Sequence, residues 1–165
     1  TEQENVGIIS HNTICDNGPE LEYLRNGCTI NPNVDDKKLY IRMLGRKIYE
    51  YALKNVPAAI KETIDDADLS LEDIDKVLIH QANAKMDYAM IERLHRLYNI
   101  REYDHAISPM TIQSFGNSSV ATIPTMYDLI IKGKMEGQSF KEKGNIVMTS
   151  VGAGMNINAI VYRFP

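Results

Sequence analysis

The chain has 165 residues, a length that suits one ordinary domain and allows a sizeable buried core. Hydrophobic residues make up 44% and charged residues 24%, which excludes a disordered chain, and a net charge of -4 gives no broad basic face for nucleic acid. No apolar run approaches the roughly 18 residues of a membrane span, and the first residues lack the basic and apolar parts of a signal peptide. We therefore expect a cytoplasmic protein with neither nucleic acid nor a membrane as partner.

The first part of the sequence predicts one strand and one long helix. Residues 5–15 are rich in β-branched residues and favour a strand. Residues 16–36 carry several Gly, Pro and Asn and are predicted to be irregular, apart from one short helical turn at 20–24. From 37 to 69, apolar residues recur with the 3.6-residue period of an amphipathic helix, and Pro57 is expected to kink or divide it.

The middle of the sequence predicts a buried strand between helical segments. Ser70 and Asp73 have the spacing of a capping box and predict a short helical turn. Residues 76–80 follow as a short strand that is too apolar to face water on both sides. Residues 83–98 then return to helical spacing.

The last part of the sequence predicts a loop, a helix and a closing hairpin. The loop begins near residue 105 and turns at 116–119, and a helix containing Pro124 follows it. Residues 144–165 favour two strands joined by the turn 151–154. The order of all these elements predicts a single α/β domain, in which a mixed sheet carries helices on both faces.

Two polar stretches are candidates for a functional site. His80 ends the buried strand, at the edge of the sheet where α/β proteins bind ligands. The alternative for His80 is a core histidine that bonds a backbone group. In the second stretch, Asn117 follows Gly116 at a turn before a helix, and could aim an amide donor at a developing oxyanion or serve only as a helix cap.

Two further features of the sequence can be explained by structure alone, without a function. The glycine-rich turn 151–154 is interpreted as a tight hairpin, or as a place where a ligand approaches the backbone closely. The two cysteines, Cys15 and Cys28, are too few for a disulfide scaffold and match no common zinc spacing. We interpret them as buried or incidental thiols, and expect no metal.

Five stretches, taken in order, carry a resemblance to a known family: GIISHNTICDNGPELEYL, IRMLGRKIYEYALKNVPAAIKETI, SLEDIDKVLIHQANAKM, FGNSSVATIP and VGAGMNINAIVYRF. They resemble the C-terminal half of the β-ketoacyl-acyl carrier protein synthase III family, which belongs to the thiolase-like condensing enzymes. The resemblance runs along nearly the whole chain. It implies one C-terminal thiolase-like domain over residues 1–165, with a mixed, mainly five-stranded sheet and helices on both faces.

The resemblance also implies an activity, a decarboxylative Claisen condensation of acyl-CoA with malonyl-ACP in fatty-acid or related synthesis. His80 and Asn117 match the catalytic His and Asn of the family, which stabilise the negative charge on the malonyl thioester oxygen. For this role His80 is expected to be neutral, with its proton on Nε2. No cofactor is implied, because the substrates themselves carry phosphopantetheine.

Further positions acquire roles from the same resemblance. Asn83, Gly45 and Arg46 match residues along the pantetheine tunnel, and Val151 takes a place near the acyl pocket where the family usually has Phe. Lys85 takes a position that is usually Arg and faces the acyl carrier protein.

The main departure from the family is the missing nucleophile. The family's reactive cysteine lies in its N-terminal half, and neither cysteine of this chain matches it, so we expect the chain alone to be inactive. Its expected partners are its own N-terminal half, acyl-CoA, acyl carrier protein and a second copy in a homodimer. The alternative is a non-catalytic binding or dimerisation half, with a basic patch from four residues that could equally form a solvated helix face: Lys85, Arg93, Arg96 and Lys132.

Overall fold

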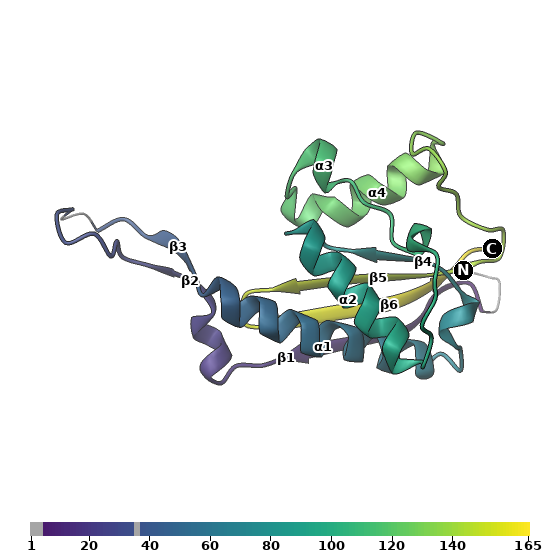
Figure 1. The fold of residues 1–165 in the computed structure, drawn as a ribbon, viewed down its shortest axis with the longest axis horizontal. Helices are drawn as coiled ribbons and strands as arrows, with labels where there is room; N and C mark the ends of the chain where they lie inside the picture. The colour runs from purple at the N-terminus through teal and green to yellow at the C-terminus, as the bar shows by residue number, and fades with distance from the viewer. Residues whose placement is uncertain (1–4, 35–36) are drawn as a thin grey trace.

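A four-stranded mixed sheet forms the centre of the computed structural model, which describes residues 5–34 and 37–165 (Figure 1). The strand order is β1-β6-β5-β4. The pairs β1–β6 and β6–β5 are antiparallel, whereas β5 and β4 run parallel. The bounds are β1 Gly7–Cys15, β4 Ile74–Ile79, β5 Asn145–Gly152 and β6 Asn156–Arg163. The predicted closing hairpin is thus confirmed as β5–β6.

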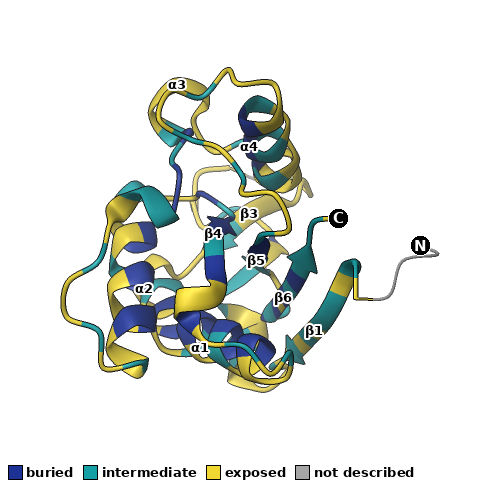
Figure 2. Cartoon of the chain, turned by 90° about the vertical axis from the view of Figure 1, so that its right-hand side faces the viewer, coloured by how far each residue is buried: buried dark blue, intermediate teal, exposed yellow. Residues whose placement is uncertain are grey.

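Helices cover both faces of this sheet, which confirms the α/β prediction. On one face lie α1, Gly45–Asp65, and α2, Ala84–Leu97, while α4, Thr122–Ile131, lies on the other (Figure 1). The side chains of β4 alternate between two cores, since Val77 and Ile79 pack with α1 and α2 whereas Leu78 packs with α4. Figure 2 shows the buried stripes of α1 and α2 turned toward the strands.

The prediction of a mainly five-stranded sheet is wrong for the described residues, whose main sheet has four strands. Beside β4, where a fifth strand could pair, the chain forms the single turn η3, His105–Ile107. The side chain of Lys76 donates from Nζ to the Ala106 carbonyl at 2.8 Å. A side-chain bond therefore joins this segment to the sheet, where a ladder would have been needed to make a strand.

A two-stranded ribbon replaces part of the predicted irregular segment and the start of the predicted helix. Strands β2, Leu24–Gly27, and β3, Tyr40–Met43, pair antiparallel, and the ribbon extends away from the body (Figure 1). The helix was thus predicted to begin too early, because the apolar residues of β3 also fit its period. The short turn expected at 20–24 is present as η1, Pro19–Glu22, and residues 35 and 36 of the irregular stretch lie outside the described residues.

The helix α1 continues through Pro57 without dividing. Proline has no N–H, so the carbonyl of Leu53, four residues earlier, loses its partner within the helix. In the structure Arg93 of α2 donates from Nη1 to the Leu53 carbonyl at 3.3 Å. The neighbouring helix therefore supplies the hydrogen bond that Pro57 removes.

The remaining short elements follow local rules of the sequence. Asp73 accepts a hydrogen bond from the Ser70 backbone N–H at 2.8 Å, which confirms the capping box at η2, Leu71–Asp73. The predicted helix at 119–131 begins as the turn η4, Ser119–Ala121, and continues as α4. A further single turn, α3, spans Ile112–Phe115.

Among the described helices, none is both long and apolar enough to cross a membrane.

Candidate active site

His80 lies at the carboxyl end of β4, directly after a strand whose last four residues are buried. Its backbone N–H donates to the Thr149 carbonyl of β5 at 3.0 Å, which extends the parallel ladder by one residue. The hairpin β5–β6 turns at this same end of the sheet, where α1 also begins (Figure 1). The backbone of His80 is therefore fixed beside the glycine-rich turn that the sequence singled out.

A cavity of about 310 Å³ opens beside the His80 imidazole. Its walls come from the η4–α4 segment and from the hairpin, and they include Val151, one of the predicted pocket residues. The other lining residues are Ser119, Val120, Ile123, Ser150, Gly152, Asn156 and Asn158. The structure thus brings His80 and Val151 together in one concave site of mixed polar and apolar character.

The His80 ring is oriented by a backbone group. Nδ1 lies 3.2 Å from the Ser119 carbonyl oxygen, and a carbonyl only accepts, so this hydrogen bond requires the proton on Nδ1. A neutral ring then has a bare Nε2, which differs from the Nε2–H form expected from the sequence. Burial lowers the pKa of His80 below 6.5, and the bond to Ser119 opposes that effect, so the neutral form is favoured.

Asn117 is connected to His80 through Ser119. Its side-chain oxygen Oδ1 accepts from the Ser119 backbone N–H at 2.8 Å, which closes a local turn directly before η4. The N-cap of η4 is Ser118, so Asn117 is not the helix cap that the sequence offered as the alternative. The residue is exposed and does not line the cavity. Its Nδ2 group has no hydrogen-bond partner among the described residues, so it is available to a ligand.

Gln81, which follows His80, is anchored to a neighbouring segment by its side chain. The side chain is 1% exposed, and its Oε1 accepts from the backbone N–H groups of Thr111 and Ile112 at 2.8 and 2.9 Å. Its Nε2 donates to the Pro109 carbonyl at 2.8 Å. Gln81 therefore ties residues 109–112, and through them α3, to the end of β4.

The other predicted site residues lie outside this cavity. Asn83 caps α2, where its side chain accepts from the backbone N–H groups of Lys85 and Met86 at 3.0 and 3.4 Å. Lys85 is exposed on the first turn of α2. Gly45 begins α1, and Arg46 pairs with Glu50 at 2.9 Å along the exposed side of that helix. Their roles along a tunnel remain predictions.

The proposed basic patch is largely engaged in local contacts. Arg96 pairs with Glu92 at 2.5 Å and Lys132 with Asp128 at 2.6 Å, both one helical turn apart. Arg93 bonds the Leu53 carbonyl, as described above. Arg96 and Lys132 thus behave as a solvated helix face, which is the alternative that the sequence left open, whereas Arg93 joins α2 to α1.

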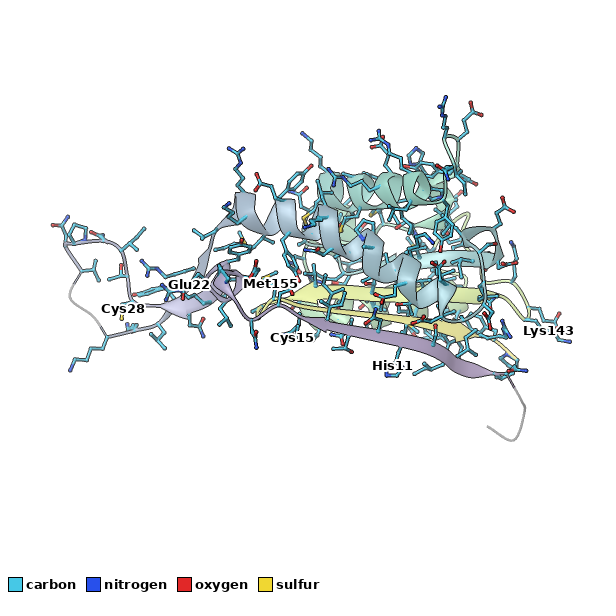
Figure 3. The ribbon with its side chains drawn as sticks, turned by 90° about the horizontal axis from the view of Figure 1, so that it is seen from below. His11, Cys15, Glu22, Cys28, Lys143 and Met155 are labelled. Carbon is cyan, nitrogen blue, oxygen red and sulfur yellow. The ribbon has the colours of Figure 1, made fainter. Side chains whose placement is uncertain are left out.

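Both cysteines are free and exposed, which excludes the buried alternative and leaves the interpretation of them as incidental thiols. Cys15 ends β1 near the body of the molecule, and Cys28 lies farther out on the ribbon (Figure 3). Neither lines the cavity beside His80. Within the described residues, no three His, Cys, Asp or Glu side chains gather to hold a metal ion.

Sequence reasoning missed two contributors to the site. The first is the Ser119 carbonyl, a backbone acceptor 39 residues from His80 that carries no signal of its own in the sequence. The second is the anchoring by Gln81. A polar residue placed directly after a buried strand was a signal for it, because such a group needs partners inside the protein.

The sequence of the chain is similar to one group of known proteins. Residues 64–164 match the family model described as 3-oxoacyl-[acyl-carrier-protein] synthase III C terminal. A β-ketoacyl-[acyl-carrier-protein] synthase III of Lactobacillus helveticus is 25% identical over 96% of this chain and 50% of its own length. The one from Streptococcus sanguinis is 33% identical over 74% of this chain and 35% of its own.

The fold comparison agrees with the sequence comparison. The crystal structure of the β-ketoacyl-[acyl carrier protein] synthase III of Thermus thermophilus aligns with a TM-score of 0.79 and 25% identity, over 99% of this chain and 48% of that one. The chain therefore spans about half the length, or less, of the relatives that it matches.

Proposed function

Because the chain belongs to the 3-oxoacyl-[acyl-carrier-protein] synthase III C-terminal family, we propose that it is the C-terminal catalytic half of a condensing enzyme. The proposed reaction is the decarboxylative condensation of acyl-CoA with malonyl-ACP in fatty-acid or related synthesis. In it, His80 and Asn117 act on the thioester oxygen, and a partner half supplies the nucleophilic cysteine. The proposal includes acyl-CoA, acyl carrier protein and a second copy of the protein as partners.

The observation that carries this proposal is the meeting of His80 with the Asn117–Ser119 turn beside one cavity. Loss of carbon dioxide leaves an enolate whose charge lies on the thioester oxygen. Hydrogen-bond donors aimed at that oxygen stabilise the transition state, and removal of one donor typically slows such a reaction by about 10²–10³-fold. We assign this role to the free Nδ2 of Asn117, whose Oδ1 is held by Ser119, a residue that lines the cavity.

In this proposal His80 donates a hydrogen bond from Nε2, and the hydrogen bond at Nδ1 determines in which protonation state it can do so. While Nδ1–H is bonded to the Ser119 carbonyl, Nε2 carries a proton only in the imidazolium form. We therefore expect the decarboxylation rate to fall as pH rises through the pKa of His80, which burial holds below 6.5. A rate that falls instead on acidification means that the neutral Nε2–H tautomer acts, and that the Ser119 bond is released in the complete enzyme.

The test measures malonyl-ACP decarboxylation by the full-length protein, with variants that separate the two halves of the Asn117 amide. The variants His80→Ala and Asn117→Ala are expected to lose about 10²-fold or more of the rate. Asn117→Asp retains an Oδ1 acceptor for the Ser119 N–H but loses the Nδ2 donor, so it is expected to fail as Asn117→Ala does. Folding is checked by circular dichroism.

Two outcomes of this test would contradict the proposed roles in different ways. Activity retained in Asn117→Asp but lost in Asn117→Ala would show that Asn117 positions Ser119 and donates nothing to the substrate. Unchanged decarboxylation in all three variants would make these residues structural. The non-catalytic binding half would then be the better account of the chain.

A further inference from the structure

The β2–β3 ribbon places two arginines directly opposite each other. In the antiparallel register Arg25 pairs with Arg42, and the next position on the same face pairs Gly27 with Tyr40. Like charges in directly opposed positions destabilise a two-stranded sheet unless something of opposite charge lies between them. The ribbon also extends away from the body of the molecule, so its own sheet gains no support from further strands (Figure 1).

Gly27 allows both guanidinium groups to converge over the ribbon. A Cβ at this glycine would lie 2.5 Å from Cδ of Arg42, so the arginine side chain occupies the space that any other residue would fill. The same point lies 3.1 Å from Nη1 of Arg25 and 3.2 Å from Nη1 of Arg42. The two Nη1 atoms are thus brought together above one backbone position, which is itself buried beneath them.

The neutralisation of this pair is incomplete. Nε of Arg25 forms an ion pair with Glu22 at 2.5 Å, and its Nη1 has only a long contact of 3.4 Å to the Asn26 carbonyl. In the part of the chain that the structure describes, the half-buried Arg42 guanidinium has no carboxylate or hydrogen-bond acceptor. One positive charge therefore remains without a partner at the centre of the pair.

A cavity of about 620 Å³ lies against this cluster. Arg25 and Arg42 form its charged part, and Tyr40, Ile41 and Met43 line it as well. Glu22, at the base of the ribbon, and Cys28, farther out, are both lining residues (Figure 3). The site thus offers two planar donor groups next to an apolar wall, and it is formed by elements other than those around His80.

We propose that the Arg25–Arg42 face of the ribbon binds the phosphate or diphosphate group of a phosphorylated ligand. Guanidinium groups match phosphate oxygens with paired, charge-assisted hydrogen bonds, which a single ammonium group cannot offer. A bound phosphate lies between the two arginines and removes their mutual repulsion, and the apolar wall receives the uncharged part of the ligand. The inference does not depend on the proposed condensing activity, since it uses none of the residues around His80.

The test titrates the protein with inorganic pyrophosphate, with coenzyme A and with pantetheine, which has no phosphate, by isothermal titration calorimetry. Pyrophosphate is expected to bind, and Arg42→Gln to weaken it about tenfold or more. Gly27→Ala keeps every charge but displaces the Arg42 side chain, so it is expected to weaken pyrophosphate as well. Glu22→Gln removes the competing carboxylate and is expected to strengthen binding.

The matched control is Arg101→Gln, which removes one positive charge from an exposed position outside the ribbon. It is expected to leave pyrophosphate binding within about twofold. No binding of pyrophosphate to the unaltered protein, or equal weakening by Arg101→Gln and Arg42→Gln, would overturn the inference. If the ribbon variants weaken coenzyme A in parallel with pyrophosphate, the phosphate belongs to a coenzyme A-type ligand. If they weaken pyrophosphate alone, the site binds free phosphates.

Discussion

Asp87 has an ionisable carboxyl group that lies in the interior of the protein. It lies in the first turns of α2, is fully buried, and both its carboxylate oxygens lack a hydrogen-bond partner among the described residues. Burial raises its pKa from 3.8 to about 7. The folded protein therefore binds a proton at Asp87 that the unfolded chain has already released, between these two pH values.

This difference predicts how the stability of the protein depends on pH. The contribution of Asp87 is fully present below pH 3.8 and declines as pH rises, until it is lost above about pH 7. Asp87→Asn has no charge to bury, so the free energy of unfolding of this variant should exceed that of the unaltered protein by an amount that grows from pH 3.8 to about 7 and is constant above it. Urea unfolding at several pH values measures the difference, and parallel curves for the two proteins would contradict the prediction.

His80 and Asp87 differ in how far their surroundings could be predicted from the sequence. The position of His80 at the end of a buried strand could be predicted, because the apolar run before it is local. Which ring nitrogen of His80 carries the proton could not be predicted, because the Ser119 carbonyl that orients the ring belongs to a distant segment. Asp87 was not predicted as buried either, since the helical pattern of α2 was read from its apolar residues alone.

The contact between α1 and α2 explains how α1 accommodates a proline in its interior. Arg93 satisfies the Leu53 carbonyl that Pro57 leaves without a partner. We predict that Arg93→Met lowers the free energy of unfolding by about 1 kcal/mol. The matched control is Arg96→Met on the same helix, which loses only the exposed ion pair to Glu92 and should change stability by about 0.5 kcal/mol or less.

A double-mutant cycle isolates this hydrogen bond. In a Pro57→Ala background the backbone N–H at position 57 can bond the Leu53 carbonyl within α1. The effect of Arg93→Met, measured by urea unfolding, should therefore become clearly smaller in that background than in the unaltered protein. An equal effect in both backgrounds would mean that Arg93 stabilises the structure by packing alone.

The elements themselves were predictable to different degrees. The strand β4, the helix α2 and the hairpin β5–β6 follow from patterns of apolar residues within short windows. The ribbon β2–β3 was missed because its strands have four residues each and its pairing joins a turn-rich segment to one with helical spacing. Strand pairing at such separation is set by register, which no local pattern records.

Several large apolar side chains on different parts of the molecule are exposed to solvent. Ile41 on the ribbon is 80% exposed and Val120 at the cavity rim is 92% exposed, and Phe115 and Ile131 are also exposed. Apolar surface of this extent promotes association. We predict that the 165-residue chain self-associates, with a mass above that of one chain by light scattering, and that Ile41→Asn or Val120→Asn lowers the association. A single-chain mass at every concentration would refute this.

The sheet order has a consequence for how the protein is made. Strand β6 lies between β1 and β5, and its pairs with β1 join Gly7 to Arg163 and Cys15 to Asn156. On the ribosome, β1 emerges long before its only ladder partner among the described strands. At a translation rate of about 5–20 residues per second, β1 waits on the order of ten seconds for β6, with one row of its N–H and C=O groups unpaired. Until translation delivers β6, this strand is an open edge that a chaperone or another nascent chain can occupy.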